Sequence, residues 1–271
     1  REDPARYDSA MHGKPTASAP PPSDDPEHYS HLTFETLRHR DLDRLHHVNN
    51  VSTISLYEDG WARFAEDQGL GTDDGVQWRV DYLGVNFRKE LYYRDDVRVG
   101  TRLAGNGDGS VVVHQMLFRG DVPVGSAERI ATPVDPHTGK LVDLPENLTA
   151  KQAGGLANLG HAPFRPAPQA SPLDPDTHYP QWREDTFRFA DLDADERVGR
   201  LAQFELIESA RVSVIQSAGP PTEDPKVIWM AVHVALNFLS WPNYPGSART
   251  GIRVDGFGRS SCRVRHTIFS E

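Results

Sequence analysis

The sequence predicts an α+β fold with two tandem domains, each a long helix packed against a curved antiparallel sheet. Three observations predict it. Apolar residues between positions 51 and 64 recur at a spacing of three or four, which is typical of an amphipathic helix. Alternating apolar residues, interrupted by glycine-containing turns, follow from 78 to 134 and predict an antiparallel meander. The second half of the chain repeats the first at a nearly constant offset, which indicates two copies of one domain.

Composition narrows the possible functions. The 271 residues suit about two domains, and the net charge of -10 argues against a general nucleic-acid binder. No apolar run approaches the roughly 18 residues of a membrane span, and the N-terminus lacks the apolar core of a secretory signal. We therefore expect a cytoplasmic protein without a membrane partner. The single cysteine, Cys262, allows no internal disulfide and is interpreted as a strand residue.

The first segments of the chain divide into an arm, a strand, a loop and a helix. Residues 1–30 hold three consecutive prolines and little apolar periodicity, so they are expected to form a flexible arm. A first strand is predicted over 32–38, followed by a loop that contains Asp41 and Asp43. The helix comes next, and Gly69 and Gly71 are expected to end it. Its apolar stripe consists of Val51, Ile54, Tyr57, Trp61 and Phe64.

The meander that follows completes the first domain. The predicted turns are 105–109 and Gly120-Asp121, and Asp135 to Gly139 is expected to form a further turn at the exit. Domain boundaries are expected at 31–146 and 183–271, with a linker over 147–182 that is rich in Pro, Gly and Ala. The predicted strands are 78–87 with a slip at Leu83-Gly84, one that starts at Val97, 111–118 and 122–134.

The internal repeat covers a whole domain. Asp191 and Asp193 match Asp41 and Asp43 at an offset of 150, and Glu208 matches Glu58. Asn237-Phe238 and 264–269 match Asn86-Phe87 and 113–118 at an offset of 151. The second copy stops after Phe269, so a counterpart of strand 122–134 is expected to be missing, and we expect that the sequence omits a tail. A sheet that lacks this strand would expose an unpaired edge.

The loop and helix start of the first copy carry the most informative motif. Residues 40–50 read Arg-Asp-Leu-Asp-Arg-Leu-His-His-Val-Asn-Asn, and Tyr57-Glu58 follow on the helix. A carboxylate beside a helix N-terminus suits attack on an acyl carbonyl. The first-turn N–H groups can stabilise developing negative charge while the carboxylate attacks or activates water.

The pattern Asp-x-Asp-x-x-x-His-Val-Asn-Asn, then Tyr-Glu, resembles the 4-hydroxybenzoyl-CoA thioesterase branch of the hotdog family, and acyl-ACP thioesterases share its core. The resemblance implies a double hotdog that hydrolyses an acyl thioester of coenzyme A or acyl carrier protein, without a cofactor. It assigns nucleophile or general base to Asp43, and an oxyanion site to the backbone near Asn50.

Other motif residues have both a functional and a structural interpretation. Asn49 and Asn50 can simply cap the helix. His47 either bonds the substrate or is structural, and a metal site that combines it with His39 and His46 is disfavoured because the side chains diverge. Glu58 is the second catalytic candidate, although pairing with an arginine is the more common role for such a residue.

Several residues are candidates for substrate binding. Asp41 is either a substitute for Asp43 or a residue that fixes the loop, and Asn49 lies at the same helix start. Trp61, like Trp78 and Tyr82, either lines the pocket or packs in the core. Arg88 and Lys89 belong to a basic cluster with Arg94 and Arg98 that either meets phosphates or is a mixed-charge surface.

The second copy departs from the motif where the chemistry would lie. Arg197 replaces the His, and Gly199-Arg200 replace the Asn-Asn pair. We therefore expect its own site to be altered or dead, while the domain still supplies a wall of the first site. Arg197 and Arg200 either hold a phosphate or carboxylate or lie on the surface, and the surface interpretation is favoured.

Two other functions stay open. A hotdog hydratase or dehydratase would pair His47 with Glu58 for proton transfer. A non-catalytic acyl-thioester binder would use the pocket without turnover. A homodimer of double hotdogs, paired through sheet edges, is a further possibility.

Overall fold

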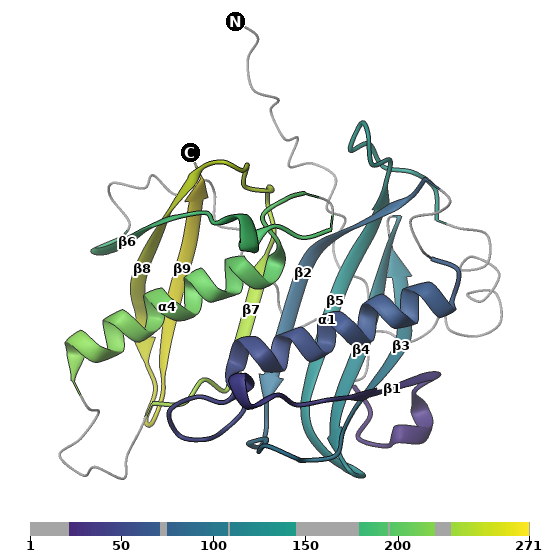
Figure 1. Ribbon diagram of the computed structural model, residues 1–271, viewed down its shortest axis with the longest axis horizontal. Coiled ribbons are helices and arrows are strands. Elements are labelled where there is room, and N and C mark those ends of the chain that lie inside the picture. Colours follow the sequence, from purple (N-terminus) through teal and green to yellow (C-terminus); the bar gives the residue numbers. More distant parts are fainter. Residues whose placement is uncertain are drawn as a thin grey trace, which may run out of the picture.

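The computed structural model describes residues 22–70, 75–107, 109–144, 179–194, 196–219 and 229–270. It confirms the α+β class and the tandem arrangement. Two long helices, α1 (Asn50–Asp67) and α4 (Arg200–Ala218), lie side by side on the same face of the sheets (Figure 1). Neither helix is both long and apolar enough to cross a bilayer, a finding that covers the described ranges only.

The first copy is a helix on a five-stranded antiparallel sheet, with strand order β1-β3-β4-β5-β2. The helix ends as the glycine pattern predicts, because Gly69 adopts a left-handed φ of 67° just beyond it. The slip expected at Leu83-Gly84 lies earlier, between Val80 and Tyr82, where the register with β5 shifts. The strands are β1 (His31–Glu35), β2 (Gln77–Phe87), β3 (Val97–Gly107), β4 (Ser110–Arg119) and β5 (Val122–Val134).

The second copy repeats this plan. Its pairings reproduce those of the first copy at the offset read from the sequence, since Arg98 pairs with Phe118 and Arg249 with Phe269. The irregularity after Leu103 in β3 recurs after Val254 in β8. The repeat is therefore structural. The strands are β6 (Gln181–Thr186), β7 (His233–Asn237), β8 (Ser247–Phe257) and β9 (Cys262–Ser270), with β6-β8-β9 as a separate three-stranded sheet.

The two copies join through β2 and β7, which pair antiparallel and extend the first sheet to six strands. The pairing is symmetric about Gly84 and Ala235, which are equivalent positions of the repeat. Backbone bonds of 3.0 Å flank it on both sides, from Phe87 N to Val232 O and from Phe238 N to Asp81 O. Each copy thus offers the same edge to the other, as in an isologous dimer interface.

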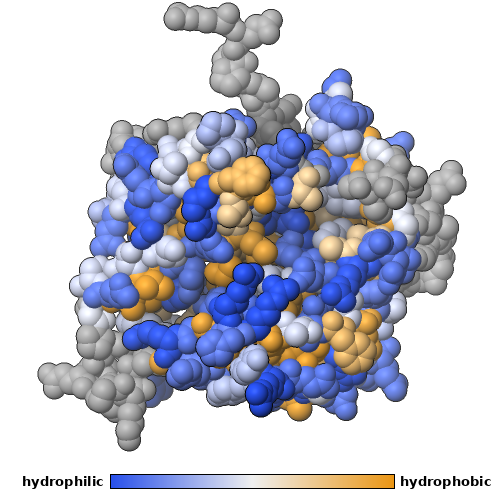
Figure 2. Space-filling model, in the orientation of Figure 1, coloured by the Kyte–Doolittle hydropathy of each residue, from blue (hydrophilic) through white to orange (hydrophobic). Residues whose placement is uncertain are grey.

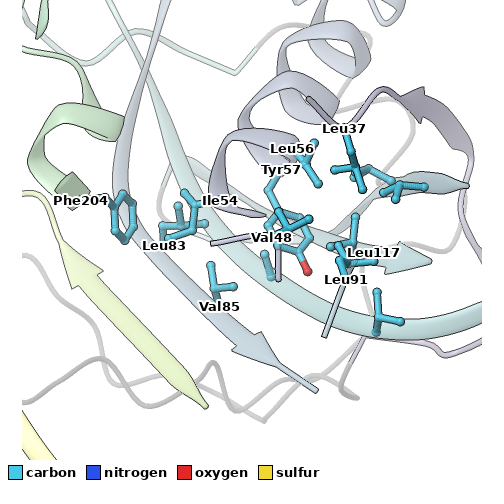
Figure 3. Packing of buried hydrophobic residues seen from close by; sticks show 14 of the residues in the cluster. Leu37, Val48, Ile54, Leu56, Tyr57, Leu83, Val85, Leu91, Leu117 and Phe204 are labelled. Carbon is cyan, nitrogen blue, oxygen red and sulfur yellow. The ribbon is translucent and has the colours of Figure 1, made fainter. Parts of the chain in front are cut away.

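The main hydrophobic core crosses this junction. Phe204 of α4 lies beside Ile54 of α1 and Leu83 of β2 in Figure 3. Phe204 is only 3 % exposed, and Leu236 of β7 also belongs to the cluster. Burial of apolar side chains from both copies in one cluster makes the two helices part of a single folding unit.

No strand equivalent to β5 follows β9 among the described residues. In the first copy, β5 fills the place between β4 and β2, and most of β4 is buried as a result. In the second copy, β9 is half-buried along its length, and Val232 beside β7 is 65 % exposed. Among the described residues, no strand therefore joins β7 to β9.

The expected flexible arm is wrong for its last residues. Residues 1–21 lie outside the described residues, but Pro26–His28 forms a 3-10 turn and Tyr29 is buried against Phe118, with ring centroids 5.8 Å apart. A Cβ at Gly100 would lie 2.7 Å from Tyr29 Cγ, so a glycine is needed for this contact. Tyr179 covers Gly251 in the same way. Most of the expected linker also lies outside the described residues, and β6 begins within its last residues at Gln181.

Phe204→Ala tests the shared core. We expect a loss of about 3–5 kcal/mol in the free energy of unfolding, because the cavity would open between the copies. Urea unfolding followed by circular dichroism measures it. Val212→Ala on the exposed face of the same helix is the control and should cost less than about 0.5 kcal/mol. Equal effects of the two changes would contradict a core shared by both copies.

Candidate active site

The loop ahead of α1 is held by the carboxylate of Asp43. Its Oδ1 accepts hydrogen bonds from the backbone N–H groups of Leu45, at 2.7 Å, and His47, at 3.1 Å. The Asp43 N–H donates in turn to the His47 carbonyl at 2.7 Å. The side chain is exposed, and neither bond uses Oδ2. Asp43 thus fixes the turn with one oxygen and presents its carboxylate at the surface beside the helix.

Asp41 is bound more fully than Asp43. Its Oδ2 accepts from the Arg38 backbone N–H at 2.6 Å, and its Oδ1 accepts from the Ser52 hydroxyl at 3.4 Å. Its carbonyl receives both the backbone N–H and the side-chain amide of Asn49. These bonds tie the 3-10 turn His39–Asp41 to the first turn of α1, which supports the loop-fixing interpretation of Asp41.

The two asparagines at the helix start differ in role. Asn49 is the N-cap, and its Oδ1 accepts from the Ser52 N–H at 2.8 Å. Asn50 is the first helical residue, and its side-chain amide donates to Oε1 of Glu208 on α4 at 3.4 Å. A side chain of the second copy therefore borders the helix start of the first copy.

His47 is packed at the back of the loop. Its ring meets Tyr92 edge to face, with centroids 5.1 Å apart, and the two residues form a backbone bridge. Its Nδ1 is buried and has no hydrogen-bond partner among the described residues. Within those residues, no group of three or more His, Cys, Asp or Glu is arranged to hold a metal ion.

Glu58 is held by two arginines. Its Oε1 lies 2.7 Å from Arg129 of β5, and its Oε2 lies 2.6 Å from Arg200 at the start of α4. Burial alone would raise the pKa of Glu58, but the two guanidinium groups outweigh it and lower the pKa from 4.5 to about 2. A carboxylate ionised at all physiological pH values and shared by two cations is not available as a general acid, so the structure gives Glu58 an ion-pairing role.

Glu58→Gln tests this ion-pair cluster through its pH dependence. Because the pKa of Glu58 is lower in the folded chain, its charge stabilises the fold fully above about pH 4.5 and progressively less as the pH falls toward 2. We expect the variant to lose about 3 kcal/mol at pH 7, since the buried guanidinium of Arg129 and the partly buried one of Arg200 would lose their partner. In urea unfolding at pH 2.5, the difference from the wild type should shrink by more than half.

The control is Asp121→Asn, which removes an exposed partner of Arg98 and should change stability by at most about 1 kcal/mol at either pH. A difference between Glu58→Gln and the wild type that is the same at pH 7 and pH 2.5 would contradict the ionised, doubly paired Glu58.

Of the substrate-binding candidates, Asp41 and Asn49 lie at the loop and helix start, whereas Trp61, Arg88 and Lys89 lie elsewhere. Trp61 is buried in the core, with the Arg129 guanidinium 5.4 Å from its ring centre. Arg88 pairs with Asp24 at 2.5 Å, and Lys89 is exposed just after β2. Of the three aromatic candidates, Trp78 lines a cavity, whereas Tyr82 is buried over Gly84.

The second copy keeps the loop but changes the helix start. Asp193 Oδ1 accepts from the Arg197 N–H at 3.2 Å, as Asp43 does from His47. Gly199 is the N-cap of α4 and offers no side-chain oxygen. The aspartate turn is therefore a structural device of both copies, and the residues around it set the difference in chemistry.

Sequence reasoning missed two features that join the copies. Asn50 contacts Glu208, and the equivalent pair, Arg200 and Glu58, forms the symmetric contact. The sequence signal for these contacts is the offset of 150 positions that separates Asn50 from Arg200 and Glu58 from Glu208. The second feature is a cavity of about 320 Å³ at the start of α4, which includes Asp193 and Trp241.

Comparison with known proteins agrees with this architecture. Residues 37–152 match the family model described as the thioesterase-like superfamily. The 12:0-ACP thioesterase from Umbellularia californica has a TM-score of 0.70 at 12% identity, with 88% of this chain and 87% of that chain covered. An acyl-ACP thioesterase from Bacteroides thetaiotaomicron has a TM-score of 0.62 at 11% identity, with 89% and 97% covered. No curated protein matches the chain.

The fold is thus the hotdog fold, present twice in one chain. The stretch that matches the thioesterase-like superfamily model includes the Asp43 loop and all of α1.

Proposed function

We propose that the chain hydrolyses an acyl thioester at the start of α1. The observation that carries the proposal is the exposed Asp43 carboxylate, which precedes an asparagine-capped helix and uses only Oδ1 for its turn. The superfamily match over the same loop supports it. The second copy retains the aspartate turn but has arginines in place of the His and the second Asn, so hydrolysis is proposed for the first copy alone.

The reaction needs a base and an oxyanion site. In the general-base form, Asp43 takes a proton from water, and the oxygen attacks the thioester carbonyl. The carbonyl oxygen gains negative charge, which first-turn N–H groups of α1 near Asn50 stabilise. The C–S bond then breaks, the thiolate takes up the proton, and a free acid remains. In the nucleophilic form, Asp43 attacks first and water hydrolyses the resulting anhydride.

The substrate class is an acyl-CoA or an acyl carrier protein. Two structures that align with most of this chain are named a 12:0-ACP thioesterase and an acyl-ACP thioesterase, which makes a carrier protein the first substrate to test. We also propose that the protein acts in the cytoplasm. A homodimer stays a prediction that sedimentation measurements can decide.

The dehydratase alternative loses support from the state of Glu58. That reaction needs a carboxyl group that gains and loses a proton near neutral pH. The pKa of Glu58 is lowered to about 2, and both of its oxygens are bound to arginines. The non-catalytic binder remains the alternative that an activity assay decides.

Asp43→Asn tests the proposed base. An amide oxygen can still accept from Leu45 and His47, so the turn should persist while the charge and basicity are lost. We expect kcat/KM for thiol release from acyl thioesters to fall by about 10²–10⁴-fold. Release of free thiol from a panel of short, long and aromatic acyl-CoA and acyl-ACP substrates measures it.

The matched control is Asp135→Asn, another aspartate that accepts from two backbone N–H groups in a turn. It should leave kcat/KM within about twofold. Unchanged turnover in Asp43→Asn would reject Asp43 as the base. Absence of turnover in the wild type, together with binding of acyl thioesters, would favour the non-catalytic binder.

Glu208→Ala tests the contribution of the second copy to this site. Glu208 is held by Arg211 and accepts from Asn50, so its loss should release the Asn50 side chain and lower kcat/KM by about 3- to 10-fold. Glu208→Gln keeps the acceptor and should restore most of the activity. Glu205→Ala, less than one turn away on α4, is the control. Equal rates in Glu208→Ala and Glu205→Ala would contradict the positioning role.

A further inference from the structure

The cavity of about 320 Å³ at the start of α4 lies between the copies. The second copy supplies Asp193, Arg197, Arg200 and Trp241, and β2 of the first copy supplies Trp78 and Arg79. In the symmetry of the repeat, this is the counterpart of the proposed hydrolytic site. The space-filling view shows apolar side chains near the middle of this face, over the seam between the copies, with hydrophilic residues around them (Figure 2).

Positive charge is in excess around the cavity. Three of the lining residues are arginines, Arg79, Arg197 and Arg200, and Arg200 bonds the carboxylate of Glu58. Arg197 bonds a neutral group, the Gln77 side-chain carbonyl, at 3.1 Å. Arg79 is balanced by Asp81 at 2.7 Å, and Asp193 is the one acid among the lining residues. A local cationic site in a chain of net charge -10 indicates an anionic ligand.

The walls add an apolar surface. The guanidinium of Arg200 lies 5.9 Å from the centre of the Trp241 ring, so the indole holds one arginine in place. Trp78 is fixed by a bond of 2.9 Å from its ring N–H to the Leu70 carbonyl. Gly199 gives the helix no side-chain cap. Two indoles beside guanidinium groups suit a ligand with an apolar body and an anionic head.

We propose that this cavity binds a carboxylate- or phosphate-bearing molecule with an apolar body and does not hydrolyse it. The two helix starts have diverged accordingly, since His47 and Asn50 correspond to Arg197 and Arg200. Guanidinium groups pair in forked geometry with carboxylates and phosphates. The free acid released by thioester hydrolysis and a phosphate ester of a carrier group share this chemistry. The cationic cavity stands independently of hydrolysis at α1.

Titration calorimetry with benzoate, phenyl phosphate and benzyl alcohol tests the site, because the three probes share a ring and differ in the head group. We expect at least one anion to bind at least about 10-fold more tightly than the alcohol. Tighter benzoate binding identifies a carboxylate ligand, and tighter phenyl phosphate binding identifies a phosphate ester. Arg197→Gln should weaken anion binding about 10-fold or more, while Arg188→Gln, an exposed arginine of the same copy, should not change it.

Arg197→Lys retains the charge and should restore part of the affinity, which separates charge from a loss of folding in Arg197→Gln. The Asp43→Asn chain should bind the anions as the wild type does, so a failure of the hydrolysis proposal leaves this test intact. Equal binding of benzyl alcohol and the anions, no binding of any probe, or unchanged binding in Arg197→Gln would each overturn the proposed site.

Discussion

The antiparallel pairing of β2 with β7 is the constraint on which the rest of the structure depends. It makes one sheet from strands of both copies, and it fixes a local twofold relation about Gly84 and Ala235. With the strands in this register, α1 and α4 must lie side by side, and Phe204 enters the core of the first copy. The same relation brings Asn50 to Glu208 and Arg200 to Glu58. Both helix starts are therefore built from residues of both copies, and neither would be complete in an isolated domain.

Within this symmetric frame, the two sites have taken different chemistry. Both loops use an aspartate to hold their turn, so the aspartate by itself does not mark a catalytic copy. The difference lies in the residues at the helix start. Asn49 caps α1 and leaves a neutral, N–H-rich end, which suits a developing oxyanion. Gly199 and Arg200 give α4 a cationic end with no cap, which suits a stable anion. The two copies share one fold, and substitutions at a few positions give the starts of α1 and α4 different chemical environments.

The ion pairs of Glu58 with Arg129 and Arg200 link the stability of the fold to the difference between the two sites. Glu58 is largely buried, and its charge is stabilised by two paired arginines, one of which lines the cavity of the other copy. A change at Arg200 therefore affects the anion-binding cavity and the fold together. This is why Arg197, whose side chain bonds a neutral amide, is the better position at which to separate binding from folding.

The sequence by itself determined the class of fold, the duplication and the loop that holds the candidate base. Local periodicity, turn residues and matches at a fixed offset predict these features, and all three signals can be read along the chain. The sequence left open whether Glu58 is a base or an ion-pair partner. The predictions from it were wrong for the residues around Tyr29 and for the position of the slip in β2. Only the tertiary structure decided these points. Glu58 meets Arg200 142 positions away, and Tyr29 packs against Gly100, so their environments depend on contacts between distant segments. Such contacts arise from strand register and helix packing, which no local pattern encodes.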